Sequence, residues 1–146
     1  MKKILILIFC CTPFLVIAQI KHKTKATGGA AASAATLAAG KDIYTKYCLT
    51  CHQIDGGGVP NMNPPLVKTS YVSGDKKKLI KVVLNGFMQN VDIDGESYSN
   101  TMPPHNFLKD AEIAAVLTYI RNSFGNKYSA VAATQVKAVR ATNKAN

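Results

Sequence analysis

Five consecutive residues, CLTCH at positions 48–52, contain the side chains best suited to chemistry in this chain. Cys48 and Cys51 lie three positions apart, so on a helix, or at its frayed end, both sulfur atoms share one face. His52 follows directly and offers an imidazole nitrogen to a metal. This order of residue types matches the pattern by which a haem is attached covalently. We therefore expect Cys48 and Cys51 to form thioethers with a haem and His52 to be the proximal iron ligand, a main determinant of haem chemistry.

Three other interpretations of these residues predict different proteins. A zinc site needs a second Cys/His pair at ligand spacing, and none follows Cys51. A thioredoxin-like redox pair belongs to a βαβ unit, whereas this chain shows almost no alternation typical of strands. A plain disulfide between Cys48 and Cys51 in an exported protein remains open, and it predicts a colourless protein.

The length and charge of the chain limit the classes of function. Its 146 residues fit one domain, whose small core would gain apolar surface from a buried haem. The formal net charge is +10, and lysines are concentrated at 21–25 and 76–81. Such lysines form either an ordinary solvated face or a docking surface that speeds encounter with an acidic partner. No nucleic-acid-binding motif accompanies the charge, so nucleic acid is not an expected partner.

The two ends of the chain are expected to lie outside the folded domain. Residues 1–18 resemble an export signal, with two lysines, an apolar run and a terminal alanine. The run is shorter than the roughly 20 residues of a membrane span, although a retained leader could act as an anchor. Residues 19–36 are expected to form a flexible linker rich in Ala, Lys and Gly. The domain would then occupy 37–142, with a frayed tail at 143–146.

The sequence predicts a first helix that carries the two cysteines at its end. Thr36 is the expected N-cap, and the helix should continue to about Cys51. Gly40 and Tyr44 lie four residues apart and so share one face. A glycine inside a helix costs about 1 kcal/mol relative to alanine, which suggests close approach of another backbone.

Three further helices follow from hydrophobic periodicity and helix-stop signals. We expect one from 73–75 to about 85, ended by Gly86, and a long one from 109 to about 124, ended by Gly125. A short helix is expected within 134–140. The segment from 87 to 100 reads as a loop with room for one short hairpin.

The residues after His52 are expected to form irregular structure around the ligand. Gly56, Gly57 and Gly58 form a turn that can adopt positive φ and lie against a flat ligand. Prolines exclude a helix from residues 59–66. A carbonyl group in this loop is expected to accept the free ring N–H of His52, which fixes the tautomer of a ligating histidine.

Met102 is the best candidate for the distal iron ligand. A thioether is a soft, weak ligand that favours ferrous iron, and the adjacent Pro103 stiffens its backbone. A core methionine that fills a gap is the other interpretation. The competing ligands are Met62, Met88 and His105, of which His105 would give a bis-histidine site of lower potential.

Taken together, several motifs resemble class I cytochrome c, in the order of that family. The motifs are GKDIY at 40–44, CLTCH at 48–52, PPL at 64–66, Met102-Pro103 and LTYIR at 117–121. The match covers roughly residues 37–125 and is most similar to bacterial single-domain cytochromes with a Val-x-x-Val-Arg tail, here at 136–140.

The resemblance implies an all-α fold of about four helices packed around one covalently bound haem c. It implies thioethers from Cys48 and Cys51, axial ligation by His52 and Met102, and a hydrogen bond from His52 to the carbonyl of Pro64. The resemblance also implies that Gly40 and Tyr44 cross the last long helix at Val116 and Tyr119. It further implies a hydrogen bond from Tyr98 or Asn100 near the haem. Lys109 departs from the Ser or Thr cap of relatives.

The function implied is transfer of single electrons in the periplasm by a protein that is not itself an enzyme. The expected partners are redox proteins with acidic docking surfaces: a dehydrogenase, an oxidase or a reductase. Two alternatives stay open. One is the cytochrome subunit of a periplasmic dehydrogenase or reductase complex, and the other is a haem sensor or peroxidase-like protein with an open distal site.

Overall fold

The computed structural model describes residues 32–88 and 90–144. The predicted signal at 1–18, most of the predicted linker and the last two residues of the predicted tail lie outside the described residues. In chain order the elements are α1 (Ala34–Tyr47), α2 (Leu49–His52), α3 (Ser70–Ser73), α4 (Lys76–Asn85), β1 (Val91–Ile93), β2 (Glu96–Tyr98), α5 (Asp110–Asn122) and α6 (Ala133–Thr142).

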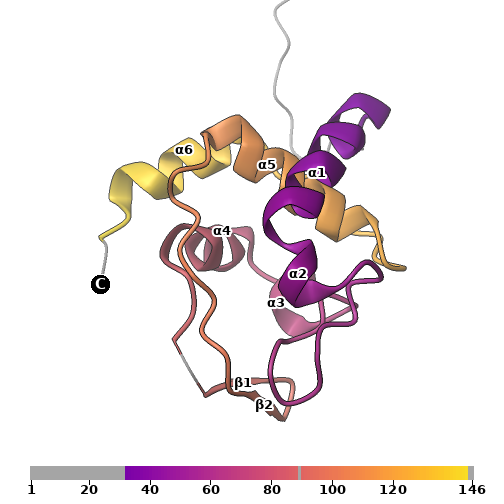
Figure 1. The fold of residues 1–146 in the computed structure, drawn as a ribbon. Coiled ribbons are helices and arrows are strands. Elements are labelled where there is room, and N and C mark those ends of the chain that lie inside the picture. The colour runs from indigo at the N-terminus through magenta and orange to yellow at the C-terminus, as the bar shows by residue number, and fades with distance from the viewer. Residues whose placement is uncertain (1–31, 89, 145–146) are drawn as a thin grey trace, which may run out of the picture.

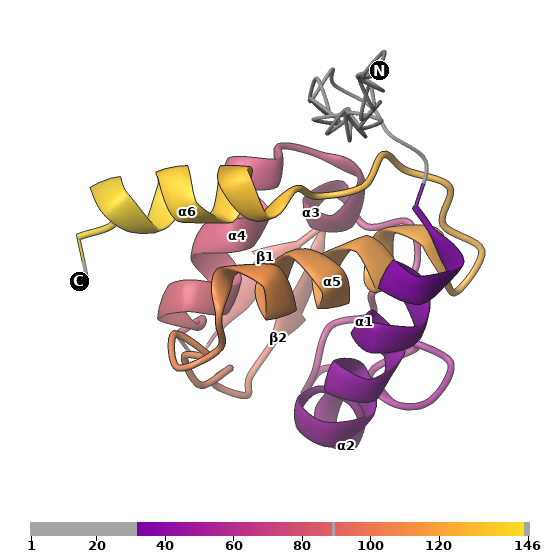
Figure 2. The same ribbon diagram turned by 90° about the horizontal axis from the view of Figure 1, so that it is seen from above.

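The predicted helical fold is confirmed, and four helices of ten or more residues dominate the described part of the chain. Helices α1 and α5 cross, α6 follows α5 along the same side, and α4 lies beneath them (Figure 1). The antiparallel strands β1 and β2 form a small hairpin at the opposite end of the molecule. Figure 2 shows α1 and α5 side by side, with α2 extending beyond them.

The crossing of α1 and α5 explains the glycine in the middle of α1. A Cβ on Gly40 would collide with the backbone carbonyl of Ala115 and the Cβ of Tyr119. One turn later, the ring of Tyr44 packs 5.5 Å from that of Tyr119, measured between centroids. The predicted close approach is therefore confirmed, and the atoms of α5 nearest to Gly40 belong to Ala115 and Tyr119.

The ends of the first helix differ from the prediction. Ser33, not Thr36, is the N-cap, because its extended backbone lets the hydroxyl accept from the Thr36 N–H at 3.1 Å. The predicted continuous helix to Cys51 is also wrong. The chain bends at Cys48, whose φ is −117°. Helix α2 then begins with a hydrogen bond that spans three residues instead of four, from the Cys51 N–H to the Cys48 carbonyl at 3.2 Å.

The predicted ends of α4 are confirmed, and the hairpin that the sequence allowed is present. Asp75 caps α4, since its carboxylate accepts from the Lys77 N–H at 2.8 Å, and Gly86 ends it with a φ of 74°. Asp94 and Gly95 join β1 to β2 with φ values of 55° and 90°. The four-residue helix α3 was not predicted.

The last two helices begin without a side-chain cap from the residue at the N-cap position. At α5 the carboxylate of Glu112 accepts from the backbone N–H of Lys109 at 2.7 Å, which is the Glu half of a capping box, while no side chain takes the place of the missing Ser or Thr. Helix α6 is longer than predicted. It buries Val136 and Val139 against the core.

Candidate functional site

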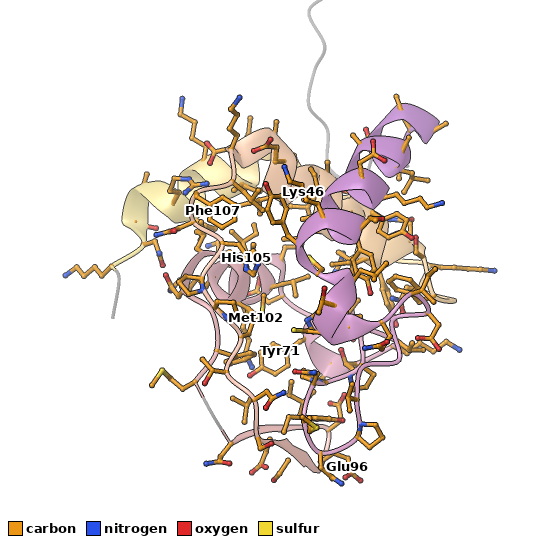
Figure 3. The ribbon with its side chains drawn as sticks, in the orientation of Figure 1. Lys46, Tyr71, Glu96, Met102, His105 and Phe107 are labelled. Atoms are coloured by element: carbon orange, nitrogen blue, oxygen red, sulfur yellow. The ribbon has the colours of Figure 1, made fainter. Side chains whose placement is uncertain are left out.

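An apolar cavity lies between the loop that follows α2 and the segment that links β2 to α5. His52, Pro64, Met102 and His105 all line it, and Cys48 lies at its wall. An adjoining cavity shares these residues and extends to Cys51. Figure 3 shows Met102 and His105 on the segment from β2 to α5, which faces α1 and α2 across the interior. The structure therefore brings the predicted motif and the predicted distal residue to one site.

His52 is held in the protonation state that suits a metal ligand. Its ring is nine-tenths buried, and its Nδ1 lies 3.0 Å from the carbonyl oxygen of Pro64. Because a carbonyl only accepts, Nδ1 carries the proton and Nε2 keeps a lone pair. Burial lowers the pKa of His52 below its ordinary 6.5, the bond to Pro64 opposes this shift, and nearby His105 adds to it. The imidazole is therefore neutral near pH 7.

The two cysteines present their sulfur atoms at the same end of the molecule, at the junction of α1 and α2. Both are free thiols; Cys48 is half-buried and Cys51 is exposed. Burial, followed by the charge of Cys51, raises the pKa of Cys48 to about 11. Within residues 32–88 and 90–144 there is no group of three His, Cys, Asp or Glu side chains that could hold a metal ion, so a zinc site gains no support there.

Met102 is the methionine that the fold brings to His52. Its backbone pairs with Phe87 in both directions, at 3.0 and 2.9 Å, which fixes the strand that carries its side chain. The rival side chains of Met62 and Met88 are 46% and 80% exposed. Neither lines the two cavities that contain His52.

His105, the other rival ligand, also lines both cavities, but the Nδ1 atom of its ring lacks a hydrogen-bond partner among the described residues. Its ring is nine-tenths buried, and its Nδ1 contacts no acceptor or donor in the described structure. A histidine that binds a metal nearly always donates its second N–H to an acceptor. His52 has such an acceptor in Pro64, whereas the Nδ1 of His105 has none among the described residues.

The cavity suits a flat, largely apolar ligand with a metal at its centre. Its deepest walls are aliphatic side chains that are almost fully buried: Leu79, Val83, Leu108, Val116, Leu117 and Ile120. Polar character is confined to a few groups, chiefly His52 and His105. An imidazole nitrogen, a thioether and two thiols around apolar walls fit a haem. Tyr98 and Asn100 line the more polar, adjoining cavity.

The glycine turn has a different role from the predicted one. Gly56 and Gly58 adopt positive φ, 71° and 66°, as expected. However, a Cβ on Gly56 would meet the ring of Phe124, and one on Gly58 would collide with the carbonyl group of Pro64. None of these glycines lines the two cavities, the turn lies against Phe124 and Pro64, and Gly58 leaves room for the acceptor of His52. The run of glycines was the available signal for this role.

The lysines of α4 do not all contribute to a free basic surface. Lys77, Lys78 and Lys81 are exposed. The Nζ of Lys76 instead donates to the carbonyl of Ala130 at 2.6 Å, and partial burial lowers its pKa. None of the helices in the described ranges has the length and apolar character required to cross a membrane.

Known proteins are similar in sequence to this domain. Residues 37–124 match the family model for cytochrome c. Cytochrome c-552 of Thermus thermophilus is 34% identical over 111 residues, which cover 70% of this chain and 84% of that protein. The cytochrome c subunit of a quinone alcohol dehydrogenase from Gluconacetobacter polyoxogenes is 32% identical over 102 residues, 60% of this chain but 19% of that protein.

These matches decide the class of the protein. Cytochrome c domains carry covalently bound haem c and act as electron carriers, not as enzymes themselves. The family model covers more than half of the chain, and the first relative matches over most of its own length. This chain therefore belongs to the cytochrome c family, and haem c is its cofactor.

Proposed function

We propose that this protein carries single electrons between redox proteins, with its haem held by Cys48, Cys51, His52 and Met102. The observation that carries the proposal is the juxtaposition of His52 and Met102 on the wall of one apolar cavity. His52 has the buried, singly protonated ring that an iron ligand needs. If His52 and Met102 both bound the iron, no site would remain there for a substrate, which agrees with an electron carrier rather than an enzyme.

Each residue has a distinct task in this proposal. The bound haem supplies iron that alternates between the ferric and ferrous states. Cys48 and Cys51 tether the macrocycle, and the Pro64 carbonyl orients His52 and raises its basicity. Met102 supplies a soft ligand, which raises the potential. The aliphatic walls exclude water, which keeps the environment of the iron nearly the same in both states and so favours fast transfer.

The net charge suggests the kind of redox partner, and the N-terminal sequence suggests the cellular location. The protein carries a formal net charge of +10, so it should dock on acidic surfaces of a dehydrogenase, oxidase or reductase. The apolar run within residues 1–18 is proposed as an export signal that directs the protein to the periplasm. The domain is proposed to extend through α6, to residue 142.

A second candidate is supported by the relatives. Several are named as cytochrome subunits of dehydrogenases, including the fructose dehydrogenase cytochrome subunit of Gluconobacter japonicus, which is 32% identical over 83% of this chain and 24% of that protein. This chain would then be the electron-transfer subunit of a dehydrogenase or reductase complex. Co-purification with a larger subunit that oxidises a substrate would support this candidate over a free carrier.

Potentiometric titration of the purified protein, combined with exposure to carbon monoxide, tests the carrier proposal. We expect one reversible one-electron transition and no rapid binding of carbon monoxide at neutral pH, because Met102 occupies the sixth position. Fast, tight binding of the gas would contradict the proposal and favour a sensor or peroxidase-like protein. A rate of electron transfer to every candidate partner that is insensitive to ionic strength would contradict basic docking.

A further inference from the structure

A groove runs along the outer surface beside Met102, between the end of α4 and the segment that links β2 to α5. Met102 lines this groove and also the cavity that contains His52. The two spaces therefore meet at the residue proposed as the distal ligand. A molecule seated in the groove would lie next to that ligand, on a different part of the surface from Cys51.

The chemistry of the groove is basic and apolar. Its lining includes Lys78, Lys81 and Arg140, and no Asp or Glu is among the described residues that line it. Both lysines are exposed, and neither lies within salt-bridge distance of a described carboxylate. Arg140 already bonds Asp110 at 2.7 Å, so the unpaired positive charge comes from the two lysines.

Aromatic and thioether side chains give the groove an apolar floor. The Nζ of Lys78 lies 3.9 Å from the centroid of the Tyr71 ring, a cation–π contact that holds both side chains in place. Tyr71 in turn packs edge-on against Phe87, with centroids 5.2 Å apart. Met88 projects at the rim and is 80% exposed. An exposed, adaptable thioether beside fixed aromatic rings is typical of a binding surface.

We propose that this groove docks an acidic segment of the redox partner that carries an apolar side chain between its carboxylates. The carboxylates would pair with Lys78 and Lys81, and the apolar side chain would lie on Tyr71 and Met88. This inference rests on the proposed function, because it places the partner against the distal ligand. A second copy of this chain is a poor occupant, since two molecules of net charge +10 repel each other.

The test uses the haem-loaded protein and a blocked peptide of four glutamates around one leucine as the probe. Titration followed by NMR amide shifts should perturb residues that line the groove, such as Met88, Thr101 and Asn143. The double variant Lys78→Glu/Lys81→Glu should weaken peptide binding by on the order of tenfold at low ionic strength.

A matched control separates the groove from overall charge. The double variant Lys41→Glu/Lys77→Glu changes the net charge equally, at exposed lysines that do not line the groove. It should retain most of the binding. Equal weakening by both variants, or amide shifts confined to the α2 end near Lys46 and Phe107, would overturn the proposal. Binding of the protein to anionic phosphatidylglycerol vesicles through Lys78 and Lys81, without any binding of the peptide, would also overturn the proposal.

The absorption spectrum of each variant keeps this test independent of the proposed function. An unchanged c-type spectrum with its sulfur-to-iron band in all variants shows that Met102 ligation holds, whatever the peptide does. Loss of that band in the unmodified protein would instead contradict the ligand assignment while leaving peptide binding to Lys78 and Lys81 measurable.

Discussion

The Nδ1 atom of His52 lies 3.0 Å from the carbonyl oxygen of Pro64, twelve residues later in the chain. This bond assigns the proton to Nδ1 and leaves Nε2 to face a metal. Pro64 holds its place partly because Gly58 has no side chain, since a Cβ there would collide with the Pro64 carbonyl. The orientation of the proposed proximal ligand thus depends on Gly58, whose own backbone N–H also donates to the carbonyl of His52 at 3.1 Å.

Replacement of Gly58 should therefore disturb the imidazole of His52 through the carbonyl of Pro64. Gly58→Ala is expected to displace the Pro64 carbonyl, weaken its bond to His52 and lower the basicity of the imidazole, which raises the reduction potential. We also expect a loss of about 1–3 kcal/mol in the free energy of unfolding from overpacking. Voltammetry and denaturant unfolding measure the two effects.

Gly125→Ala is the matched control for this prediction. Gly125 also has a positive φ, 78°, but a Cβ there would have no neighbour within 4 Å. The control therefore carries the backbone strain without the collision. It should leave the potential unchanged, and an equal shift of potential in both variants would show that strain alone, not Pro64, is responsible.

Gly40→Ala should destabilise the protein although alanine is the better helix former. In an exposed helix the change would gain about 1 kcal/mol. Here the added Cβ collides with Ala115 and Tyr119, so α1 and α5 must separate, at a net loss of about 1–3 kcal/mol. The reverse change at exposed Ala39, Ala39→Gly, should cost about 1 kcal/mol through propensity alone. Thermal unfolding of both variants checks the prediction, and a stabilised Gly40→Ala protein would show that the helices do not meet there.

Sequence patterns predicted most of the helical fold and failed where the chain gives no local signal. Gly86 marks the end of α4 and Asp75 its beginning because each has a definite backbone preference. No glycine or proline lies at the bend at Cys48, so the sequence predicts a continuous helix there. Ser33 and Thr36 are both good caps, and the choice between them depends on a backbone angle that the sequence does not state.

The site was predictable to the extent that its residues form motifs. The spacing of Cys48, Cys51 and His52 is local, so the sequence identified them directly. The place of Met102 beside His52 depends on pairing with Phe87, a contact between distant segments that no local pattern reveals. The lack of a hydrogen-bond partner for the Nδ1 of His105 among the described residues likewise becomes apparent only in three dimensions.

Arg140 is expected to hold the segment that follows Met102. Its guanidinium donates to the carbonyls of Asn106 and Leu108 at 2.9 and 2.7 Å and pairs with Asp110 at 2.7 Å. The side chain is partly exposed, which reduces the value of the ion pair. Arg140→Ala should lower the free energy of unfolding by about 1–2 kcal/mol and lower the pH at which the sulfur-to-iron band disappears.

Two further variants make the role of Arg140 specific. Arg140→Lys keeps the charge but not the planar fork, so it should restore only part of the loss. Lys137→Ala removes the same charge from an exposed position of α6 and should change stability by less than about 0.5 kcal/mol. Equal losses from Arg140→Ala and Lys137→Ala would mean that the hydrogen bonds to the carbonyls contribute nothing.

The buried phenol of Tyr44 should make the free energy of unfolding fall at alkaline pH. Its hydroxyl donates to the Gln53 carbonyl at 2.5 Å, and burial raises the pKa of the phenol above its ordinary 10.0. The native state keeps this proton where the unfolded chain loses it, so the contribution is complete below pH 10 and declines as the pH rises further. Tyr44→Phe should be less stable than the parent at pH 7 by about 1 kcal/mol. The difference in the free energy of unfolding between the parent and Tyr44→Phe should narrow above pH 10. Denaturant unfolding at several pH values measures this difference, and a constant or widening difference would contradict the hydrogen bond proposed for Tyr44.

The near-infrared absorption spectrum of the oxidised protein tests the central claim most directly. We predict a c-type spectrum with a weak sulfur-to-iron band that is lost in Met102→Ala and kept in Met62→Ala and Met88→Ala. A band that survives in Met102→Ala, or is absent from the unmodified protein, would contradict ligation by Met102. A protein without haem would contradict the whole account and return Cys48 and Cys51 to a plain disulfide.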